Sequence, residues 1–133
     1  MTVEETNVRS YPERKQYMLT FELEFEHSND YVLIASSVPY SYSKLIRELG
    51  QLEQEALATG RVKWKVGSVG TTLCNNEVPE VSITSSESAK TDKEKKMIII
   101  MARQHPGEVW SSYVCEGVMR ALIKDSPESK YLL

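Results

Sequence analysis

The 133 residues are 41% hydrophobic and 26% charged, which is typical of a globular protein and not of a disordered one. The formal net charge of −3 argues against nucleic acid as the main partner. The acidic N-terminus, the short apolar runs and the two widely separated cysteines indicate no secretory signal, membrane span or disulfide framework, so we expect a cytoplasmic protein that contacts no membrane.

The first part of the chain shows β patterns. In residues 18–26, apolar residues alternate with glutamates, which is the period-two pattern of a half-buried strand. Residues 28–30 form a turn signal, and residues 31–36 have the composition of a more buried strand. We therefore predict that these two strands pair as a hairpin.

The next segment changes to an alternation of helix and strand patterns. Ser43 is a candidate cap for a helix that runs to about Ala58 and ends at Gly60. Short strands are predicted at residues 62–67 and 78–84, followed by a charged loop. The apolar residues that fall at helical spacing are Leu45, Leu49, Leu52 and Ala56.

Residues 97–102, Met-Ile-Ile-Ile-Met-Ala, have the composition of a strand buried on both faces. We expect its three isoleucines to be buried and Ile99→Asp to be strongly destabilising. A helix is predicted from Val109 to Ile123, and a further helix starts near residues 125–128. The fold class is therefore mixed α/β.

The main candidate site is the motif His105-Pro106-Gly107-Glu108, which follows the apolar segment. A catalytic zinc commonly takes two histidines and one carboxylate and leaves the fourth position to water. His105 can supply a nitrogen and Glu108 an oxygen, and ligand sites in α/β sheets lie just past such strands. Taken alone, the spacing also fits a surface histidine with a first-turn glutamate that favours the helix dipole.

Three segments, in the same order along the chain, resemble the cytosolic carboxypeptidases. Residues 97–112 resemble the strand of that family that ends in Ala-Arg-x-His-Pro-Gly-Glu, although Gln104 and Trp110 depart from the usual residues. Residues 38–43 resemble its Pro-Tyr-(Ser/Thr)-Tyr-Ser segment, and residues 72–84 its Leu-Gly-Gly-Asn-x-Val-Pro-x-Leu-Thr-Ile-Thr segment. The chain thus resembles the N-terminal portion of a family member.

The resemblance implies a domain organisation. Residues 1–39 correspond to the C-terminal strands of an N-terminal β-sandwich domain. Residues 40–133 correspond to the first half of the zinc-carboxypeptidase α/β domain.

The resemblance also implies an activity. Family members are zinc metallocarboxypeptidases that remove C-terminal glutamates from polyglutamylated tubulin or from other acidic protein ends, in the cytoplasm and at microtubules or cilia. His105 and Glu108 match the first two zinc ligands. The third ligand, the residues that hold the substrate carboxylate and the general base lie in the family beyond a helix that here ends near Lys124, so no catalytic residue is assigned. Arg103 is the cation nearest the motif.

Three hypotheses follow from these observations. The first is part of a zinc carboxypeptidase, inactive by itself and completed by further chain or by a protein partner. The second is a non-catalytic structural or binding module of a larger assembly. The third is an unrelated α/β domain with a chance His-x-x-Glu.

Overall fold

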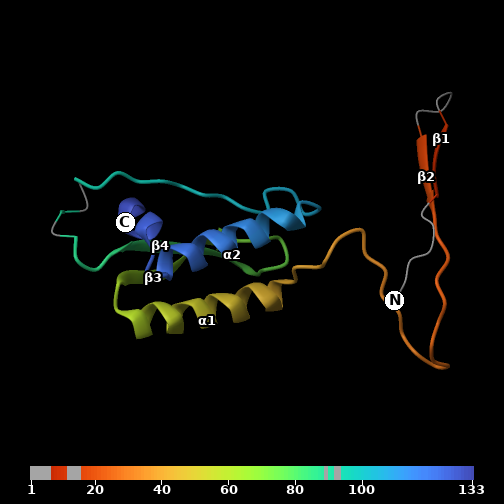
Figure 1. Cartoon of the computed structure of the whole chain (residues 1–133), viewed down its shortest axis with the longest axis horizontal. Coiled ribbons are helices and arrows are strands. Elements are labelled where there is room, and N and C mark those ends of the chain that lie inside the picture. Colours follow the sequence, from red (N-terminus) through yellow and green to blue (C-terminus); the bar gives the residue numbers. More distant parts are fainter. Residues whose placement is uncertain (1–6, 12–15, 89, 92–93) are drawn as a thin grey trace. The chain divides into compact units, whose positions relative to one another are not determined.

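The computed structural model describes residues 7–11, 16–88, 90–91 and 94–133, and the chain forms two compact units, Met1–Ile34 and Ala35–Leu133 (Figure 1). In the first unit, β1 (Asn7–Tyr11) pairs antiparallel with β2 (Gln16–Thr20). The predicted hairpin of residues 18–26 and 31–36 is wrong, because β2 ends at Thr20 and residues 21–41 hold no strand. Neither segment has a core to face, since Phe21 and Phe25 are 41% and 62% exposed and the side chains of residues 31–36 are all exposed.

The second unit contains the helices and strands that the sequence predicts between residues 42 and 133, apart from the apolar strand. This confirms a mixed α/β fold. The predicted β-sandwich and the boundary at residue 40 stay predictions. The elements are α1 (Tyr42–Thr59), β3 (Val62–Thr71), β4 (Glu77–Ser85), α2 (Val109–Ile123) and α3 (Pro127–Leu132).

Local sequence signals explain both ends of α1. Its cap is Ser41, two residues before the predicted Ser43, and the Ser41 hydroxyl accepts a hydrogen bond from the Lys44 amide at 3.1 Å. At the other end, Gly60 adopts φ 63°, and its amide donates to the Ala56 carbonyl oxygen at 3.1 Å. Glycine is favoured there because a side chain strains this left-handed backbone conformation.

The strands β3 and β4 form a long antiparallel hairpin, in register from Val62 opposite Ser85 to Thr71 opposite Glu77. A bulge between Ser68 and Gly70 interrupts the register. The helices α1 and α2 both lie along this hairpin in Figure 1, and α1 contacts β3 as well as α2.

The core lies where the two helices meet the start of the hairpin. Its buried residues come from three elements: Leu52 and Ala56 from α1, Val62 from β3, and Ile123 from α2. Side chains of Trp64, Ile83, Met119 and Leu133 pack against them from the periphery. In the part of the chain that the structure describes, none of the helices has the length and hydrophobicity needed to cross a membrane.

Arg61, the residue directly before β3, makes hydrogen bonds to the connection between α2 and α3. The Arg61 guanidinium donates to the carbonyl oxygens of Ile123 and Lys124 and to the Ser129 hydroxyl. Ser129 is buried and forms a capping box with Ser126, which begins α3. These hydrogen bonds hold the end of α2 and the start of α3 against the start of β3.

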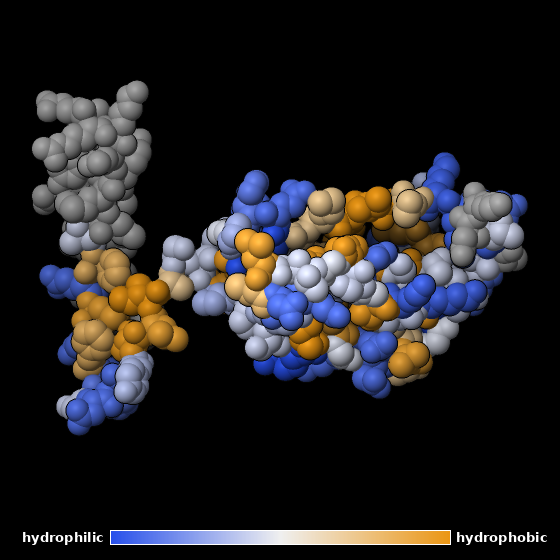
Figure 2. All heavy atoms as spheres, turned by 180° about the vertical axis from the view of Figure 1, so that it is seen from behind, coloured by the Kyte–Doolittle hydropathy of each residue, from blue (hydrophilic) through white to orange (hydrophobic). Residues whose placement is uncertain are grey.

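The prediction of a buried strand at residues 97–102 is wrong. These residues are extended but unpaired, and Ile98, Ile99 and Ile100 are 74%, 71% and 52% exposed. A strand that is apolar on both faces is stable only between neighbouring strands and under covering helices, and among the described residues β3 pairs with β4 alone. Figure 2 shows hydrophobic side chains at the surface of this unit.

This exposure reverses the expected effect of a charge at position 99. Ile99→Asp is expected to change the free energy of unfolding of this chain by less than about 0.5 kcal/mol, because exposed substitutions away from packed groups have small effects. Urea denaturation followed by circular dichroism measures the change. A loss of several kcal/mol would show that the segment is buried in solution.

Candidate functional site

The His105–Glu108 turn lies between the extended segment of residues 97–102 and α2. The Glu108 amide donates to the His105 carbonyl oxygen at 3.1 Å, and the Val109 amide donates to the Gly107 carbonyl oxygen at 3.0 Å. Glu108 occupies the N-cap position of α2, but its side chain makes no capping hydrogen bond. The carboxylate is therefore available to the histidine three residues earlier.

The two predicted metal ligands converge on one another. His105 Nδ1 lies 2.8 Å from Glu108 Oε1. A tetrahedral zinc with bonds of about 2.0–2.1 Å separates its ligand atoms by about 3.3 Å, so small side-chain rotations would admit the ion between them. The nitrogen and oxygen donors also match the ligand types that zinc accepts. This pair therefore fits half of a zinc coordination shell.

The remaining half of such a shell is open. The side chains of His105 and Glu108 are 76% and 57% exposed. Among the described residues, no group of three or more histidine, cysteine or acidic side chains is placed to hold a metal ion. The other histidine, His27, is exposed in a bend of the first unit.

Arg103 and Ser111 hold the turn from either side. The Arg103 amide donates to the Ser111 hydroxyl oxygen at 2.8 Å, and that hydroxyl donates to the Glu108 carbonyl oxygen at 2.7 Å. The Arg103 side chain donates from Nε to the Pro106 carbonyl oxygen at 2.8 Å and from Nη1 to the Tyr40 carbonyl oxygen at 3.0 Å. Its guanidinium is thus occupied by backbone oxygens.

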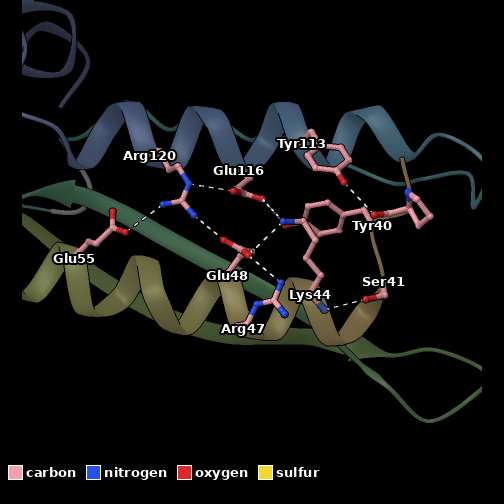
Figure 3. A network of polar contacts seen from close by, with 10 residues as sticks. Tyr40, Ser41, Lys44, Arg47, Glu48, Glu55, Tyr113, Glu116 and Arg120 are labelled. Carbon is pink, nitrogen blue, oxygen red and sulfur yellow. Dashed lines mark hydrogen bonds and ion pairs between the residues drawn. The ribbon is translucent and has the colours of Figure 1, made fainter. Parts of the chain in front are cut away.

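A group of charged and aromatic side chains joins α1 to α2 (Figure 3). We call Tyr40, Lys44, Glu48, Glu116 and Arg120 the interhelix cluster. Arg120 pairs with Glu48 at 2.7 Å and with Glu116 at 3.0 Å. Lys44 also pairs with both carboxylates, at 3.3 and 3.8 Å, and the Tyr40 hydroxyl donates to Glu116 at 3.0 Å.

The aromatic rings complete the cluster at the end nearest the turn. The ring of Tyr40 meets that of Tyr113 edge to face, with centroids 4.8 Å apart. The Lys44 ammonium lies 5.0 Å from the Tyr40 centroid and 5.5 Å from that of Tyr113, within range of a cation–π interaction. The Tyr113 hydroxyl donates to the Pro39 carbonyl oxygen at 3.0 Å.

The surroundings shift two pKa values in the cluster. Burial alone would raise the pKa of Glu48, but hydrogen bonds and positive charge from Lys44 and Arg47 outweigh it and lower that pKa. Burial raises the pKa of Tyr40 well above its usual range, and its hydrogen bond to the Glu116 carboxylate adds to the rise. Glu48 is therefore held ionised. Tyr40 is held neutral, and its role is structural rather than in proton transfer.

The cluster is not among the features predicted from the sequence. Two signals point to it. Glu48 falls one residue before Leu49, on the buried side of α1, and Glu116 and Arg120 have the i,i+4 spacing of an ion pair. Which helix faces the pair cannot be read from spacing alone.

The cysteines and tryptophans differ in how far they are buried. Cys115 is half-buried, and burial raises the pKa of its thiol, whereas Cys74 is exposed in the turn between β3 and β4. Trp64 packs against the core, but Trp110, on the first turn of α2, is mostly exposed.

Comparison with known proteins gives consistent matches. Residues 53–133 match the family model of zinc carboxypeptidases. The chain is 33% identical to cytosolic carboxypeptidase 2 of Xenopus tropicalis over 95% of its own length and 13% of that protein. It is 29% identical to mouse cytosolic carboxypeptidase 6, over 90% of the chain and 21% of that protein, and 31% identical to human cytosolic carboxypeptidase 4, over 87% and 11%.

The chain thus spans only about a tenth to a fifth of the length of these relatives. No solved structure matches it. The His105–Glu108 turn, α2 and α3 all lie within the residues that match the zinc carboxypeptidase model.

Proposed function

The chain belongs to the zinc carboxypeptidase family, and on that premise we propose that it supplies His105 and Glu108 as two protein ligands of the zinc centre of a carboxypeptidase. The observation that carries the proposal is the 2.8 Å approach of His105 Nδ1 and Glu108 Oε1 on one tight turn. The reaction is hydrolysis of a C-terminal peptide bond.

The residues of this chain have defined parts in that centre. When bound, zinc supplies Lewis acidity to polarise a scissile carbonyl and to lower the pKa of a water molecule. His105 binds as a neutral imidazole and Glu108 as a carboxylate. Pro106 and Gly107 make the turn short enough for both side chains to reach one point. No general base is assigned to this chain.

The substrates and setting of the whole protein follow from the family. The resemblance supports acidic C-termini, including polyglutamylated tubulin, as substrates. The names of the relatives support the cytoplasm as the setting, and tubulin as substrate would bring the protein to microtubules or cilia.

This chain by itself is expected to show no peptidase turnover. Two protein ligands leave the remaining zinc positions to water, which gives weak binding without a fixed geometry. A catalytic centre also needs a general base within hydrogen-bond reach of the attacking water. The remaining groups would come from further chain or from a protein partner that completes the domain.

A metal-binding test checks the proposal. The zinc affinity of the full chain, measured by equilibrium dialysis at zinc concentrations that load a weak two-ligand site, is expected to fall at least about tenfold in His105→Ala, since loss of groups in a metal site costs this much or more. The matched control is His27→Ala, which removes the other histidine and is expected to retain the zinc of the wild type. Release of glutamate from a peptide with a polyglutamate end is measured in parallel. Equal zinc in His105→Ala and the wild type would contradict the proposal.

A second candidate function is a non-catalytic binding module. It is favoured by the exposed apolar side chains of residues 97–101, because large exposed apolar patches mark contact surfaces. In this case the chain would bind no zinc at His105 and would serve as part of an assembly. The same dialysis experiment separates the two candidates.

A further inference from the structure

The backbone of Arg103 adopts an uncommon conformation beside the metal-binding turn. Its φ is 60°, in the left-handed region, which a residue with a long side chain rarely occupies. Such a conformation persists only where surrounding contacts hold it. The contacts here are three hydrogen bonds. The Arg103 amide donates to the Ser111 hydroxyl oxygen, and the guanidinium donates to the carbonyl oxygens of Pro106 and Tyr40.

The two carbonyl oxygens belong to parts of the chain that are far apart in sequence. Pro106 stands in the middle of the His105–Glu108 turn, directly after the histidine. Tyr40 precedes α1 by two residues and is buried. The donors of the planar Arg103 guanidinium have a fixed geometry, so this one group fixes the distance between the carbonyl oxygens of Pro106 and Tyr40.

The Tyr40 end of this connection is firmly anchored. Its hydroxyl donates to Glu116, its ring contacts the ring of Tyr113, and the Lys44 ammonium lies over it. The neighbouring Pro39 carbonyl oxygen accepts from Tyr113. A contact to the Tyr40 carbonyl is thus a contact to the rigid α1–α2 pair.

We infer that Arg103 is a positioning residue that ties the metal-binding turn to the α1–α2 pair and thereby fixes where His105 and Glu108 point. The inference rests on the proposed function insofar as it takes the turn to be a metal-binding one. The structural role of Arg103 is independent of zinc. Without the guanidinium, the turn loses its attachment to Tyr40, and its own short hydrogen bonds open more often. Of the three described contacts that hold the left-handed backbone of Arg103, the hydrogen bond to Ser111 then remains.

Arg61 offers a matched control for this role. It also donates through its guanidinium to carbonyl oxygens, those of Ile123 and Lys124, but at the opposite end of α2. Replacing either arginine with methionine keeps the length and removes the charge and donors. The two variants release hydrogen bonds at opposite ends of α2, and Arg61→Met also removes the hydrogen bond to Ser129 and an ion pair with Asp125.

Hydrogen–deuterium exchange of the full metal-free chain tests the structural part. The amides of Glu108 and Val109, which are bonded within the turn, are expected to exchange at least about tenfold faster in Arg103→Met and at the wild-type rate in Arg61→Met. Unchanged exchange in Arg103→Met would overturn the inference. If this variant unfolds throughout, Arg103→Lys decides in the same way, because it retains a charge but not the fork.

Zinc dialysis on the same variants tests the functional part. Arg103→Met is expected to retain at least about tenfold less zinc than Arg61→Met, as loss of outer supporting groups costs 10- to 100-fold in affinity. Zinc retention equal in the two variants overturns the positioning of the ligands. A wild type that takes up no more zinc than His105→Ala overturns the proposed function, and the exchange rates then decide the role of Arg103 by themselves.

Discussion

Leu52→Ala is expected to destabilise the second unit by about 2–5 kcal/mol, the range found when a leucine is removed from a packed core. Leu52 is fully buried, and it contacts residues of α1, β3 and α2 in the core cluster. Among the residues that the structure describes, that core has four buried members, Leu52, Ala56, Val62 and Ile123. Few neighbours are available to collapse into the cavity, so the loss is expected near the upper part of the range.

The same helix supplies the control. Leu57, five residues further along α1, is 65% exposed, so Leu57→Ala is expected to change the free energy of unfolding by less than about 0.5 kcal/mol. Urea denaturation followed by circular dichroism at 222 nm measures both variants. Similar losses of stability in Leu52→Ala and Leu57→Ala would mean that α1 does not pack on β3 through Leu52 in solution.

The elements that could be predicted from the sequence are those whose causes are local. The helix α1 follows from the spacing of Leu49, Leu52 and Ala56 and from Gly60 at its end, and these signals operate within a few residues. The limits of α2 were also predicted correctly, from Val109 to Ile123. The cap of α1 differed by two residues because Ser41 and Ser43 are both suitable cap residues and sequence does not rank them.

The elements that could not be predicted depend on partners. The apolar residues 97–102 have strand composition, but a strand needs neighbours to pair with, and composition does not state whether the neighbours are in the same chain. The predicted hairpin of residues 18–26 and 31–36 was wrong for a similar reason, since alternation indicates a buried face only where a second layer covers it.

The candidate site divides in the same way. The convergence of His105 and Glu108 follows from a motif of four residues and is seen in the structure as a contact of 2.8 Å. The attachment of the turn through Arg103 joins residues 63 positions apart, and the interhelix cluster joins Glu48 to Arg120 over 72 positions. Such pairings depend on how α1 and α2 pack, so they became visible only with the fold.

The interhelix cluster makes part of the free energy of unfolding dependent on pH. The pKa of Glu48 is lowered in the folded chain, so its ionised form is stabilised by folding. The contribution is therefore present above the ordinary glutamate pKa of 4.5 and is lost as the pH falls through the lower folded value. Positive groups from both helices face this carboxylate, namely Lys44 and Arg47 from α1 and Arg120 from α2.

Glu48→Gln is expected to lower the Tm at pH 7 by about 4–8 °C, the shift that a destabilisation of ordinary size for a point substitution produces in a unit of about 100 residues. At pH 3, below the ordinary glutamate pKa of 4.5, part of this contribution is lost, so the difference between the two proteins is expected to be smaller than at pH 7. Both proteins still lose stability in acid, because salt bridges and hydrogen bonds also lower the pKa values of Asp125 and Glu128.

Glu53→Gln is the matched control, since it makes the same chemical change on α1 outside the interhelix cluster. It is expected to follow the wild type at both pH values. Thermal unfolding followed by circular dichroism at pH 7 and pH 3 gives the four differences needed. If Glu48→Gln lowers the Tm equally at both pH values, the lost stability comes from packing of the side chain and not from its charge, and the ion pairs to Arg120 and Lys44 do not hold α1 against α2.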